Sequence, residues 1–484
     1  MTASQLLGAA FMSKPLQEIP VEVKLYEKTD KIYPRETTGR FQRLRVASVY
    51  TLLGLYYALP WINWDGRQAV LFDLPARKFH IFFLTFWPQD FIFLTLLLIL
   101  AGLSLFFFTA IAGRVWCGYA CPQTVWTEAF IWMERWVEGT RAQQMKLASA
   151  PMSWAKARKR ITKQGLWISF ALFTGLTFVG YFQPIRGLVV DFAQFQVGGW
   201  ALFWVLFYGF ATYGNAGFMR EQVCKYMCPY ARFQSAMFDR DTLIVAYDTQ
   251  RGEPRSRGKR RKEDADSQLG DCIDCGICVQ VCPTGIDIRD GLQYECIACA
   301  ACIDGCDEVM TKVGLPTGLI KYSTEAQDHG APKSLVQILL RPRVIVYATL
   351  LAAVFVGFVT ALVMRSSFQV DVLRDRNAFF RWAENDTIEN SFQVRVMNKS
   401  QQDQSYIVTV TGLEAAQAVW AKPESDGASR VVAAGEIGEF TVLVQLPESA
   451  EYKRSQVIQL GFEETRGDKP ETVIEETRFW GPER

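Results

Sequence analysis

Eight of the twelve cysteines lie in one segment, as two copies of a single spacing pattern. In each copy, two, two and three residues separate successive cysteines. The copies are Cys272, Cys275, Cys278 and Cys282, followed by Cys296, Cys299, Cys302 and Cys306. Bacterial ferredoxins use this spacing, in which three close thiolates hold one four-iron cubane and the fourth cysteine ligates the other cluster. The segment therefore predicts two [4Fe-4S] clusters.

This pattern assigns four cysteines to each cluster, with the fourth ligand exchanged between the copies. The first cluster takes Cys272, Cys275, Cys278 and Cys306, and the second takes Cys296, Cys299, Cys302 and Cys282. A pair of zinc sites is the alternative, although zinc motifs seldom repeat four cysteines at this spacing. Asp307 stands where the first copy has Pro283; it adds a negative charge near a cluster and leaves the ligation unchanged.

The other four cysteines form two Cys-x-x-x-Cys-Pro motifs, Cys117 with Cys121 and Cys224 with Cys228. A spacing of four residues predicts both thiols on one helix face, where Pro122 or Pro229 can kink or restart the helix. Such thiols can bind a soft ion such as Cu(I), exchange electrons as a dithiol, or converge, all four, on one metal. Buried structural cysteine is the alternative, and the repetition with proline argues against it.

Other candidate ligands are few. Three methionines flank the second motif, Met219, Met227 and Met237, and are candidates to assist copper, but packing is the commoner role of methionine. The two histidines, His80 and His329, lie in different loops, whereas a transmembrane haem needs a matched pair on facing helices. Intramembrane haem is therefore disfavoured, and the chemistry rests on thiolates.

The elements that must position these thiols include long apolar stretches. Five stretches free of Asp, Glu, Lys and Arg are about long enough to cross a bilayer as helices: 46–64, 91–113, 164–185, 192–219 and 344–364. A buried core helix is the alternative for any one of them. Residues 79–86 are apolar but too short, which favours an interfacial or re-entrant segment. The charged first 43 residues lack a short apolar core, so the first span itself should act as the targeting signal.

Basic residues orient these spans. Residues 114–163 hold nine Lys and Arg and residues 220–262 hold eleven, whereas the loop between the third and fourth spans offers only Arg186. Because positive loops stay in the cytoplasm, we expect a bacterial inner-membrane protein with a cytoplasmic N-terminus and a periplasmic segment after residue 364. All twelve cysteines then lie on the cytoplasmic side, where structural disulfides are rare, which favours metal or redox chemistry.

After residue 366 apolar residues alternate with polar ones. The alternating sets are Phe392, Val394 and Val396; Tyr406, Val408 and Val410; Phe440, Val442, Val444 and Leu446; and Ile458, Leu460 and Phe462. Short alternating strands predict an immunoglobulin-like antiparallel β-sandwich. This segment has no Cys or His, so we expect it to serve in docking rather than in chemistry.

The whole chain is thus predicted to be a multi-domain membrane protein with five transmembrane α-helices, a bacterial-ferredoxin-like insert with two [4Fe-4S] clusters and a C-terminal immunoglobulin-like sandwich. The predicted boundaries are 1–45 for a cytoplasmic arm, 46–239 for four spans, 240–340 for the insert, 341–365 for the fifth span and 366–484 for the sandwich. Each pair of the first four spans ends in a Cys-x-x-x-Cys-Pro motif, which predicts duplicated hairpins. A net charge of +2 is too small to indicate nucleic-acid binding.

The motifs resemble those of the cytochrome c oxidase accessory family called CcoG, FixG or RdxA. The resemblance covers nearly the whole chain and includes WCGYACPQTVW, the second Cys-x-x-x-Cys-Pro at Cys224, CIDCGICVQVCPTGIDIRDGLQYECIACAACIDGCDEVM and the β domain; Asp307 fits the family pattern. It implies assembly of a cbb-type haem–copper oxidase, with Cu(II) reduced to Cu(I) at the four Cys-x-x-x-Cys-Pro thiols. The implied partners are oxidase assembly factors, copper chaperones or transporters, and the lipid bilayer.

Two rival functions remain. Membrane polyferredoxins of nitrate and nitrous oxide respiration also carry Cys-x-x-x-Cys-Pro repeats, so the chain could instead link the quinone pool to a partner protein without copper. A scaffold whose clusters only stabilise the fold is the third hypothesis. Because the sequence shows no dinucleotide-binding motif, we expect the electron donor to be a cytoplasmic protein or the quinone pool.

Overall fold

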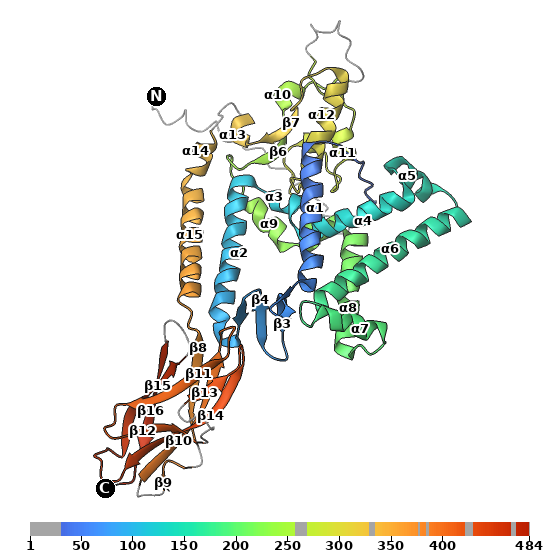
Figure 1. Cartoon of the computed structure of the whole chain (residues 1–484). Coiled ribbons are helices and arrows are strands. Elements are labelled where there is room, and N and C mark those ends of the chain that lie inside the picture. The colour runs from blue at the N-terminus through green and yellow to red at the C-terminus, as the bar shows by residue number, and fades with distance from the viewer. Residues whose placement is uncertain are drawn as a thin grey trace, which may run out of the picture.

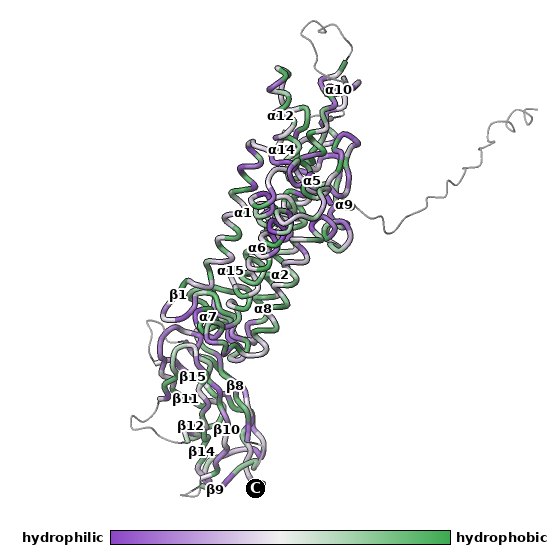
Figure 2. Tube along the Cα trace, turned by 90° about the vertical axis from the view of Figure 1, so that its right-hand side faces the viewer, coloured by the Kyte–Doolittle hydropathy of each residue, from purple (hydrophilic) through white to green (hydrophobic). Residues whose placement is uncertain are grey.

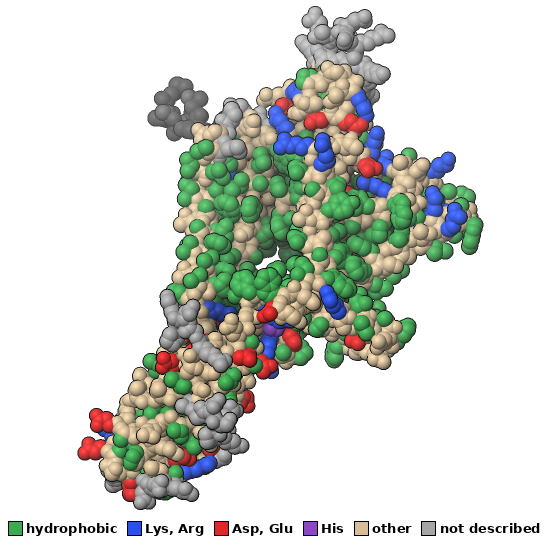
Figure 3. Space-filling model, in the orientation of Figure 1, with side chains coloured by type: hydrophobic (Ala, Val, Ile, Leu, Met, Phe, Trp, Pro, Cys, Tyr) green, Lys and Arg blue, Asp and Glu red, His purple; other side chains and the backbone are tan. Residues whose placement is uncertain are grey.

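The computed structural model describes residues 31–256, 269–328, 334–375, 378–383, 387–421, 429–465 and 471–483, and His329 lies outside them. The described chain forms three regions along one long axis (Figure 1). The cysteine-rich region lies at one end, long helices form the middle, and an all-β region forms the other end. Hydrophobic side chains cover much of the middle, whereas Lys and Arg gather toward the cysteine-rich end (Figure 3).

The middle region contains most of the helices. In chain order they are α1 (Arg40–Ala58), α2 (Phe91–Ala112), α3 (Val115–Tyr119), α4 (Pro122–Glu138), α5 (Arg141–Ser149), α6 (Trp154–Val179), α7 (Ile185–Ala193), α8 (Gly199–Thr212), α9 (Pro229–Ala236), α14 (Leu335–Leu339) and α15 (Pro342–Val363). Helix α2 packs against α15, and α6 packs against α4 and α8. Hydrophobic residues concentrate along these central helices (Figure 2).

Two helices in the described chain are long and apolar enough to cross a membrane, Pro88–Ala112 and Pro342–Val363. They match the predicted spans 91–113 and 344–364. The helices at the other three predicted spans, as far as the structure describes them, are not both long and apolar enough by the same criterion, and their bounds also differ from the predicted ones. Helix α1 ends at Ala58 because Pro60 follows in a short 3₁₀ turn, six residues before the predicted end at 64.

The third and fourth predicted spans are also divided differently. Helix α6 begins ten residues early, within a basic stretch, and ends at Val179, so 180–184 form a turn before α7. Pro184 accounts for the break, because proline cannot donate the next helical hydrogen bond. The predicted span 192–219 starts at the end of α7, and its helix α8 continues as a π-helix over Tyr213–Met219.

Residues 79–86 form strands rather than a helix. Three antiparallel strands, β3 (Val70–Asp73), β4 (Lys78–Ile81) and β5 (Leu84–Phe86), make a small sheet beside the pair β1 (Asn63–Trp64) and β2 (Arg67–Gln68). A backbone hydrogen bond of 2.7 Å from Phe72 N to Tyr181 O joins this sheet to the end of α6.

The C-terminal region is a β-sandwich, as the alternation predicts. Its strands are β8 (Phe368–Arg374), β9 (Arg381–Ala383), β10 (Thr387–Asn398), β11 (Gln404–Thr411), β12 (Gln417–Trp420), β13 (Ser429–Val432), β14 (Ile437–Pro447), β15 (Ser455–Glu464) and β16 (Thr472–Trp480). One sheet has the order β12-β14-β10-β8 with β9 beside β10, and the other has the order β13-β11-β15-β16. The predicted alternating residues, such as Phe392 and Phe462, fill the core between the sheets.

The cysteine-rich region is closed by a two-stranded sheet. Strand β6 (Ile244–Tyr247) pairs with β7 (Ile320–Ser323) and brings the two ends of the region together. The short helices between them are α10 (Thr249–Gly252), α11 (Ile277–Gln280) and α12 (Ala301–Val313), and α13 (Glu325–Asp328) follows β7. Val245, Leu319 and Ile320 pack around buried cysteines, so the sheet forms one wall of the site.

Candidate functional site

Two separate cavities lie among the eight ferredoxin-type cysteines. The first, with about 360 Å³ of empty space, is lined by Cys272, Cys275, Cys278 and Cys306. The second, with about 340 Å³, is lined by Cys282, Cys296, Cys299 and Cys302, and Cys278 also borders it. The first lining contains one cysteine of the second sequence copy, Cys306, and the second lining contains two of the first copy, Cys282 and Cys278.

The two sequence copies fold the same way. Asp274 and Gly276 have positive φ, two and four residues after Cys272, and Ala298 and Ala300 have positive φ at the same distances after Cys296. Alternating left-handed residues turn successive backbone N–H groups inward and create a concavity that suits an anion. A thiolate-ligated iron–sulfur cluster is such an anion, and this backbone therefore favours it.

Most of these thiols are shielded from water. Burial raises the pKa of Cys278 to about 11 and the pKa of Cys296 to about 12. Burial, with the neighbouring Cys278 and Cys275, also raises the pKa of Cys306 to about 12. Iron binding must therefore displace protons from these thiols. Of the eight, Cys275 is the one classed as exposed, so the first cavity reaches the surface there.

In each of the two remaining motifs the first cysteine lies within a short helix and the second directly precedes a new one. Cys117 lies in α3, and Cys121 is the extended N-cap before Pro122 at the first position of α4. Cys224 lies in a π-helix, Val223–Met227, and Cys228 is extended before α9. The prediction of both thiols on one helix face is therefore wrong for each motif. Proline excludes its preceding residue from the helical conformation, so the helix restarts instead.

The structure brings the two motifs together. Burial is the main cause that raises the pKa of Cys117 to about 12. The negative charges that Cys121, Cys224 and Cys228 would carry as thiolates also raise this pKa. Cys117 Sγ also donates to Gln234 Oε1 of α9 at 3.3 Å. Three or more Cys, His, Asp or Glu side chains do not meet at one ion anywhere in the described residues. The four thiols of the two motifs therefore do not all surround one point at which a single metal ion could bind.

The first thiol motif, at Cys117 and Gly118, lies against the wall of the second cavity. Cys117 packs against an apolar cluster of buried residues that includes Ile297 and Cys299. A Cβ on Gly118 would lie 2.7 Å from the Ile297 carbonyl oxygen and 2.9 Å from Cys299 Cα, so only glycine allows this approach. The Arg114 guanidinium donates to the Tyr294 carbonyl on one side and to Ala231 O of α9 on the other.

A buried carboxylate joins the cysteine-rich region to α1. Asp304, between Cys302 and Cys306, accepts hydrogen bonds from Phe41 N at 3.3 Å and Gln42 N at 2.6 Å. It thereby caps the N-terminus of α1 from a distant part of the chain. Asp304 and Gly118 were missed from the sequence, because neither forms a local motif.

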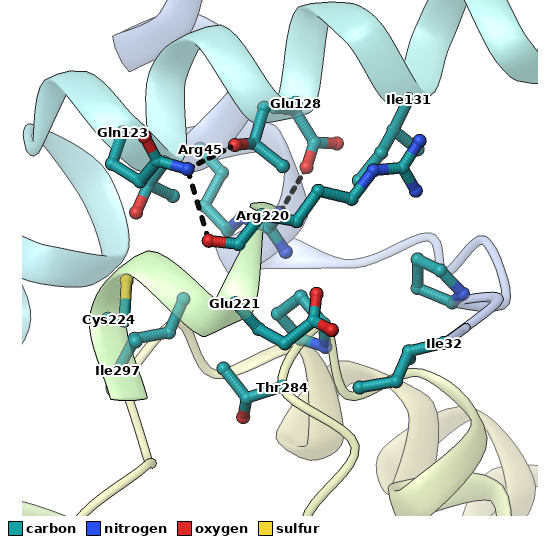
Figure 4. A pocket seen from close by; sticks show the side chains of 14 residues that line it. Ile32, Arg45, Gln123, Glu128, Ile131, Arg220, Glu221, Cys224, Thr284 and Ile297 are labelled. Carbon is teal, nitrogen blue, oxygen red and sulfur yellow. Dashed lines mark hydrogen bonds and ion pairs between the residues drawn. The ribbon is translucent and has the colours of Figure 1, made fainter. Parts of the chain in front are cut away.

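A pocket with a mixed charged and apolar lining opens beside Cys224 (Figure 4). Its empty space is about 510 Å³ and includes open solvent. Its walls come from α4, from the second thiol motif and from the loop after Cys282, with Glu128, Glu221 and Thr284 among the lining residues. Burial raises the pKa of Glu221, whose carboxyl group faces this pocket. Cys224 is thus one of the residues that line this pocket.

Two backbone turns of similar conformation precede the two thiol motifs. Gly113 (φ 54°, ψ −120°) and Arg220 (φ 39°, ψ −110°) each end a helix four residues before the first cysteine of a motif. Arg220 Nη2 lies 2.7 Å from buried Glu134 Oε2, and its guanidinium lies 5.5 Å from the Trp167 ring centroid. Burial raises the pKa of Glu134, but Arg220 and Lys31 outweigh it and lower this pKa to about 2.

The positive φ of Arg220 leads to a prediction about thermal stability. Arg220→Gly should melt at a higher temperature than Arg220→Ala, because glycine removes a backbone strain of about 1–3 kcal/mol. Both variants lose the same ion pair, and Lys31 and Lys163 still neutralise Glu134. Thermal unfolding of the purified full chain measures the difference. Gly113→Ala is the matched control and should have a lower melting temperature than the wild type. If Arg220→Ala melts at the same temperature as Arg220→Gly, the backbone at position 220 is not strained.

The remaining candidate side chains lie elsewhere. His80 is in β4, with Nδ1 3.0 Å from Thr85 Oγ1, and burial lowers its pKa to about 4, so it is neutral at pH 7. Of the methionines near the second motif, Met227 is exposed, and Met219 and Met237 are half-buried. These placements add no ligand to the thiol site.

Comparisons with known proteins agree with this architecture. Residues 219–325 match a "4Fe-4S dicluster domain", residues 93–139 a "4Fe-4S binding domain", and residues 358–482 an "IG-like fold at C-terminal of FixG". The nitrogen fixation protein FixG of Rhizobium meliloti is 39% identical over 88% of this chain and 88% of its own length. Protein RdxB of Cereibacter sphaeroides is 43% identical over 80% of this chain and 83% of its own length. A crystal structure of a FixG-related protein from Vibrio parahaemolyticus matches 24% of this chain and 97% of its own, with 25% identity and a TM-score of 0.20.

Proposed function

Because this chain belongs to the FixG/RdxA family of iron–sulfur electron-transfer proteins, we propose that it reduces Cu(II) to Cu(I) at its two Cys-x-x-x-Cys-Pro motifs. The Cu(I) would serve assembly of a cbb-type cytochrome oxidase. The observation that carries this proposal is the contact between Cys117, Gly118 and the wall of the second cavity at Cys299. It joins a group that binds soft metal ions to a group that supplies electrons.

The ligands of the two clusters follow the cavity linings. Cys272, Cys275, Cys278 and Cys306 hold the first cluster, and Cys282, Cys296, Cys299 and Cys302 hold the second. The crossed assignment is favoured because Cys306 and Cys282 each line the cavity formed mainly by the other copy. Zinc is disfavoured, because thiols that surround a single zinc ion would form a compact group, and the described residues contain none.

Electrons would pass from the cluster held at the first cavity to the cluster held at the second. Cys275, which would hold the first cluster, is exposed, so a cytoplasmic donor protein could approach there, and a quinone remains the alternative donor. The second cavity would hold the other cluster, and its wall at Cys299 belongs to the apolar group against which Cys117 packs. One electron from a reduced cluster converts one Cu(II) to Cu(I). Thiolates prefer Cu(I), so the product stays bound until a chaperone, transporter or assembly factor accepts it.

The membrane topology is part of the proposal. Helices α2 and α15 cross the inner membrane, and α1, α6 and α8 with its π-helical extension complete five spans. Support comes from apolar side chains that these three helices expose in the middle of the molecule, including Leu55, Phe173 and Phe207. The basic cysteine-rich end is then cytoplasmic, together with the N-terminus, and the β-sandwich is periplasmic.

Serine at all four motif cysteines tests the copper role. The variant Cys117→Ser, Cys121→Ser, Cys224→Ser, Cys228→Ser should keep both cluster signals and lose Cu(II) reduction, because it removes the acceptor and leaves the electron source. Electron paramagnetic resonance measures the clusters, and a Cu(I)-specific chelator measures the product. Replacing only the pair at 117 and 121 should cost more than replacing only the pair at 224 and 228, since the first pair contacts the second cluster.

Two outcomes would favour other functions. Unchanged copper reduction by the fourfold variant, with clusters that quinol reduces in membranes, would support a respiratory module between the quinone pool and a partner. The match of residues 93–139 to a 4Fe-4S binding domain favours another occupant of the four thiols, a further cluster. About twelve irons per chain instead of about eight would identify that occupant.

A further inference from the structure

A buried hydroxyl lies beside one of the eight ferredoxin-type cysteines. Thr284 Oγ1 is 3.2 Å from Cys282 Sγ, and either atom could donate the hydrogen bond between them. Thr284 is only 4% exposed, and it lines both the second cavity and the pocket beside Cys224. Figure 4 shows Thr284 on the side of this pocket opposite α4, with its oxygen turned away from that helix. Thr284 therefore belongs to the wall between the pocket and the second cavity.

A tight turn places this hydroxyl beside the sulfur. Residues 282–285 read Cys-Pro-Thr-Gly, and Gly285 N donates to Cys282 O at 3.2 Å, which closes a β-turn. Proline suits the second position of such a turn because its ring fixes φ, and Gly285 ends the turn with a φ of 71°. The turn folds the chain back on itself, so the Thr284 side chain lies next to the cysteine two residues before it.

The second sequence copy folds differently after its last cysteine. Asp307 follows Cys306 in place of proline, and the chain continues as helix α12. The residue that corresponds to the threonine is Glu308, which forms an ion pair with Lys312 on the helix surface. Burial and the neighbouring thiols raise the pKa of Cys306 to about 12, and the charge of Asp307 adds to this rise. Cys306 therefore faces a negative charge where the first copy offers a hydroxyl.

Iron binding at Cys282 would fix the direction of the hydrogen bond. A cysteine binds iron as a thiolate and then has no proton to donate. The Thr284 hydroxyl must therefore be the donor once Cys282 holds iron. Hydrogen bonds to the sulfurs are among the factors that set the reduction potential of a cluster. Because reduction adds negative charge, such a donor stabilises the reduced form more than the oxidised form and raises the potential.

We propose that Thr284 is a positioning residue for electron transfer, whose hydroxyl acts through Cys282 and raises the reduction potential of the second cluster. This inference rests on the crossed ligation given under the proposed function, and it holds for any electron acceptor. The wall of the second cavity at Cys299 belongs to the apolar group against which Cys117 packs. A higher potential there favours electron transfer from the first cluster toward the thiol motifs.

Redox titration of the purified full chain under electron paramagnetic resonance tests this role. Thr284→Val keeps the branched shape of the side chain and removes the hydroxyl. At a fixed solution potential, the ratio of reduced to oxidised second cluster should fall roughly three- to tenfold, because part of the strength of a hydrogen bond to a charged group differs between the two states. Thr284→Ser keeps the donor and should keep the wild-type potential.

A threonine near the first cavity provides the matched control. Thr311 lies on α12, and its Oγ1 donates to the carbonyl oxygen of Asp307 at 2.7 Å rather than to a sulfur. Thr311→Val should therefore leave both potentials unchanged.

A background with one cluster identifies which cluster responds. Cys272→Ser removes a ligand of the first cluster, so the remaining signal comes from the cluster that Cys296, Cys299 and Cys302 hold. Adding Thr284→Val to this background should lower the potential of the remaining signal. A shift that appears only when both clusters are present would assign Cys282 to the first cluster and overturn the proposal.

Iron content separates an effect on potential from a structural effect. Each single threonine variant should keep about eight irons per chain. Loss of iron in Thr284→Val, an unchanged potential in that variant, or an equal fall in Thr284→Ser would overturn the role of the hydroxyl. These titrations contain no copper, so their result is independent of whether the same chain reduces Cu(II).

Discussion

Replacing Cys282 by serine should remove the cluster held by Cys296, Cys299 and Cys302, and should leave the other cluster in place. Cys282 belongs to the first sequence copy, yet its thiol lines the second cavity. A cubane that loses one of four thiolates loses a covalent bond to iron and the burial that goes with it. The iron content should therefore fall from about eight to about four per chain.

A double variant distinguishes the crossed arrangement from one in which each sequence copy holds its own cluster. In the crossed arrangement Cys282 and Cys296 ligate one cluster, so Cys282→Ser combined with Cys296→Ser should lose no more iron than either change alone. If each copy held its own cluster, the double variant would lose nearly all its iron. Cys306→Ser combined with Cys272→Ser is the mirror test on the first cavity. Iron analysis after anaerobic purification distinguishes these outcomes.

Gly118→Ala should slow copper reduction while both clusters remain. The added Cβ would meet the Ile297 carbonyl oxygen at 2.7 Å and Cys299 Cα at 2.9 Å, and both are backbone atoms that cannot rotate away. The thiol motif must therefore move away from the second cluster. A displacement of about 1 Å at a reacting centre can cost about 100-fold in rate. Single-turnover oxidation of the reduced clusters by Cu(II) measures the effect.

A glycine that precedes the second motif provides the control for Gly118→Ala. Gly214 lies ten residues before Cys224, and a Cβ there meets no atom within 4 Å, so Gly214→Ala should leave the rate unchanged. The second motif has Lys225 at the position that corresponds to Gly118, which fits the contact of only the first motif with a cluster. An unchanged rate in Gly118→Ala, with intact clusters, would mean that electrons do not pass through this contact.

The sequence predicted best those features that local patterns encode. The ferredoxin spacing assigned two sets of four cysteines, and these sets line the two cavities. The alternation at Phe392, Tyr406 and Phe462 identified the sandwich, because strand residues alternate between core and surface. The repeat of Cys-x-x-x-Cys-Pro predicts a duplication, and the backbone turns at Gly113 and Arg220, four residues before each motif, have similar conformations.

Features that depend on distant contacts could not be predicted. Asp304 caps α1, more than 260 residues earlier in the chain, and no local pattern marks it. The strained turn at Arg220 depends on Glu134 in α4. Charge-free stretches gave the position of apolar segments but not the ends of helices, because the prolines at 60 and 184 break them without adding charge. The predicted shared helix face of Cys117 and Cys121 failed for the same reason, at Pro122.

The account depends most on electrons passing from the clusters to copper, and one titration tests that directly. The purified chain is reduced anaerobically, its iron is counted, and Cu(II) is added in steps under electron paramagnetic resonance. We expect about eight irons per chain, and cluster signals that disappear as one Cu(I) forms per electron, up to two per chain. Cluster signals that persist beside unreacted Cu(II), or four or fewer irons per chain, would contradict the account.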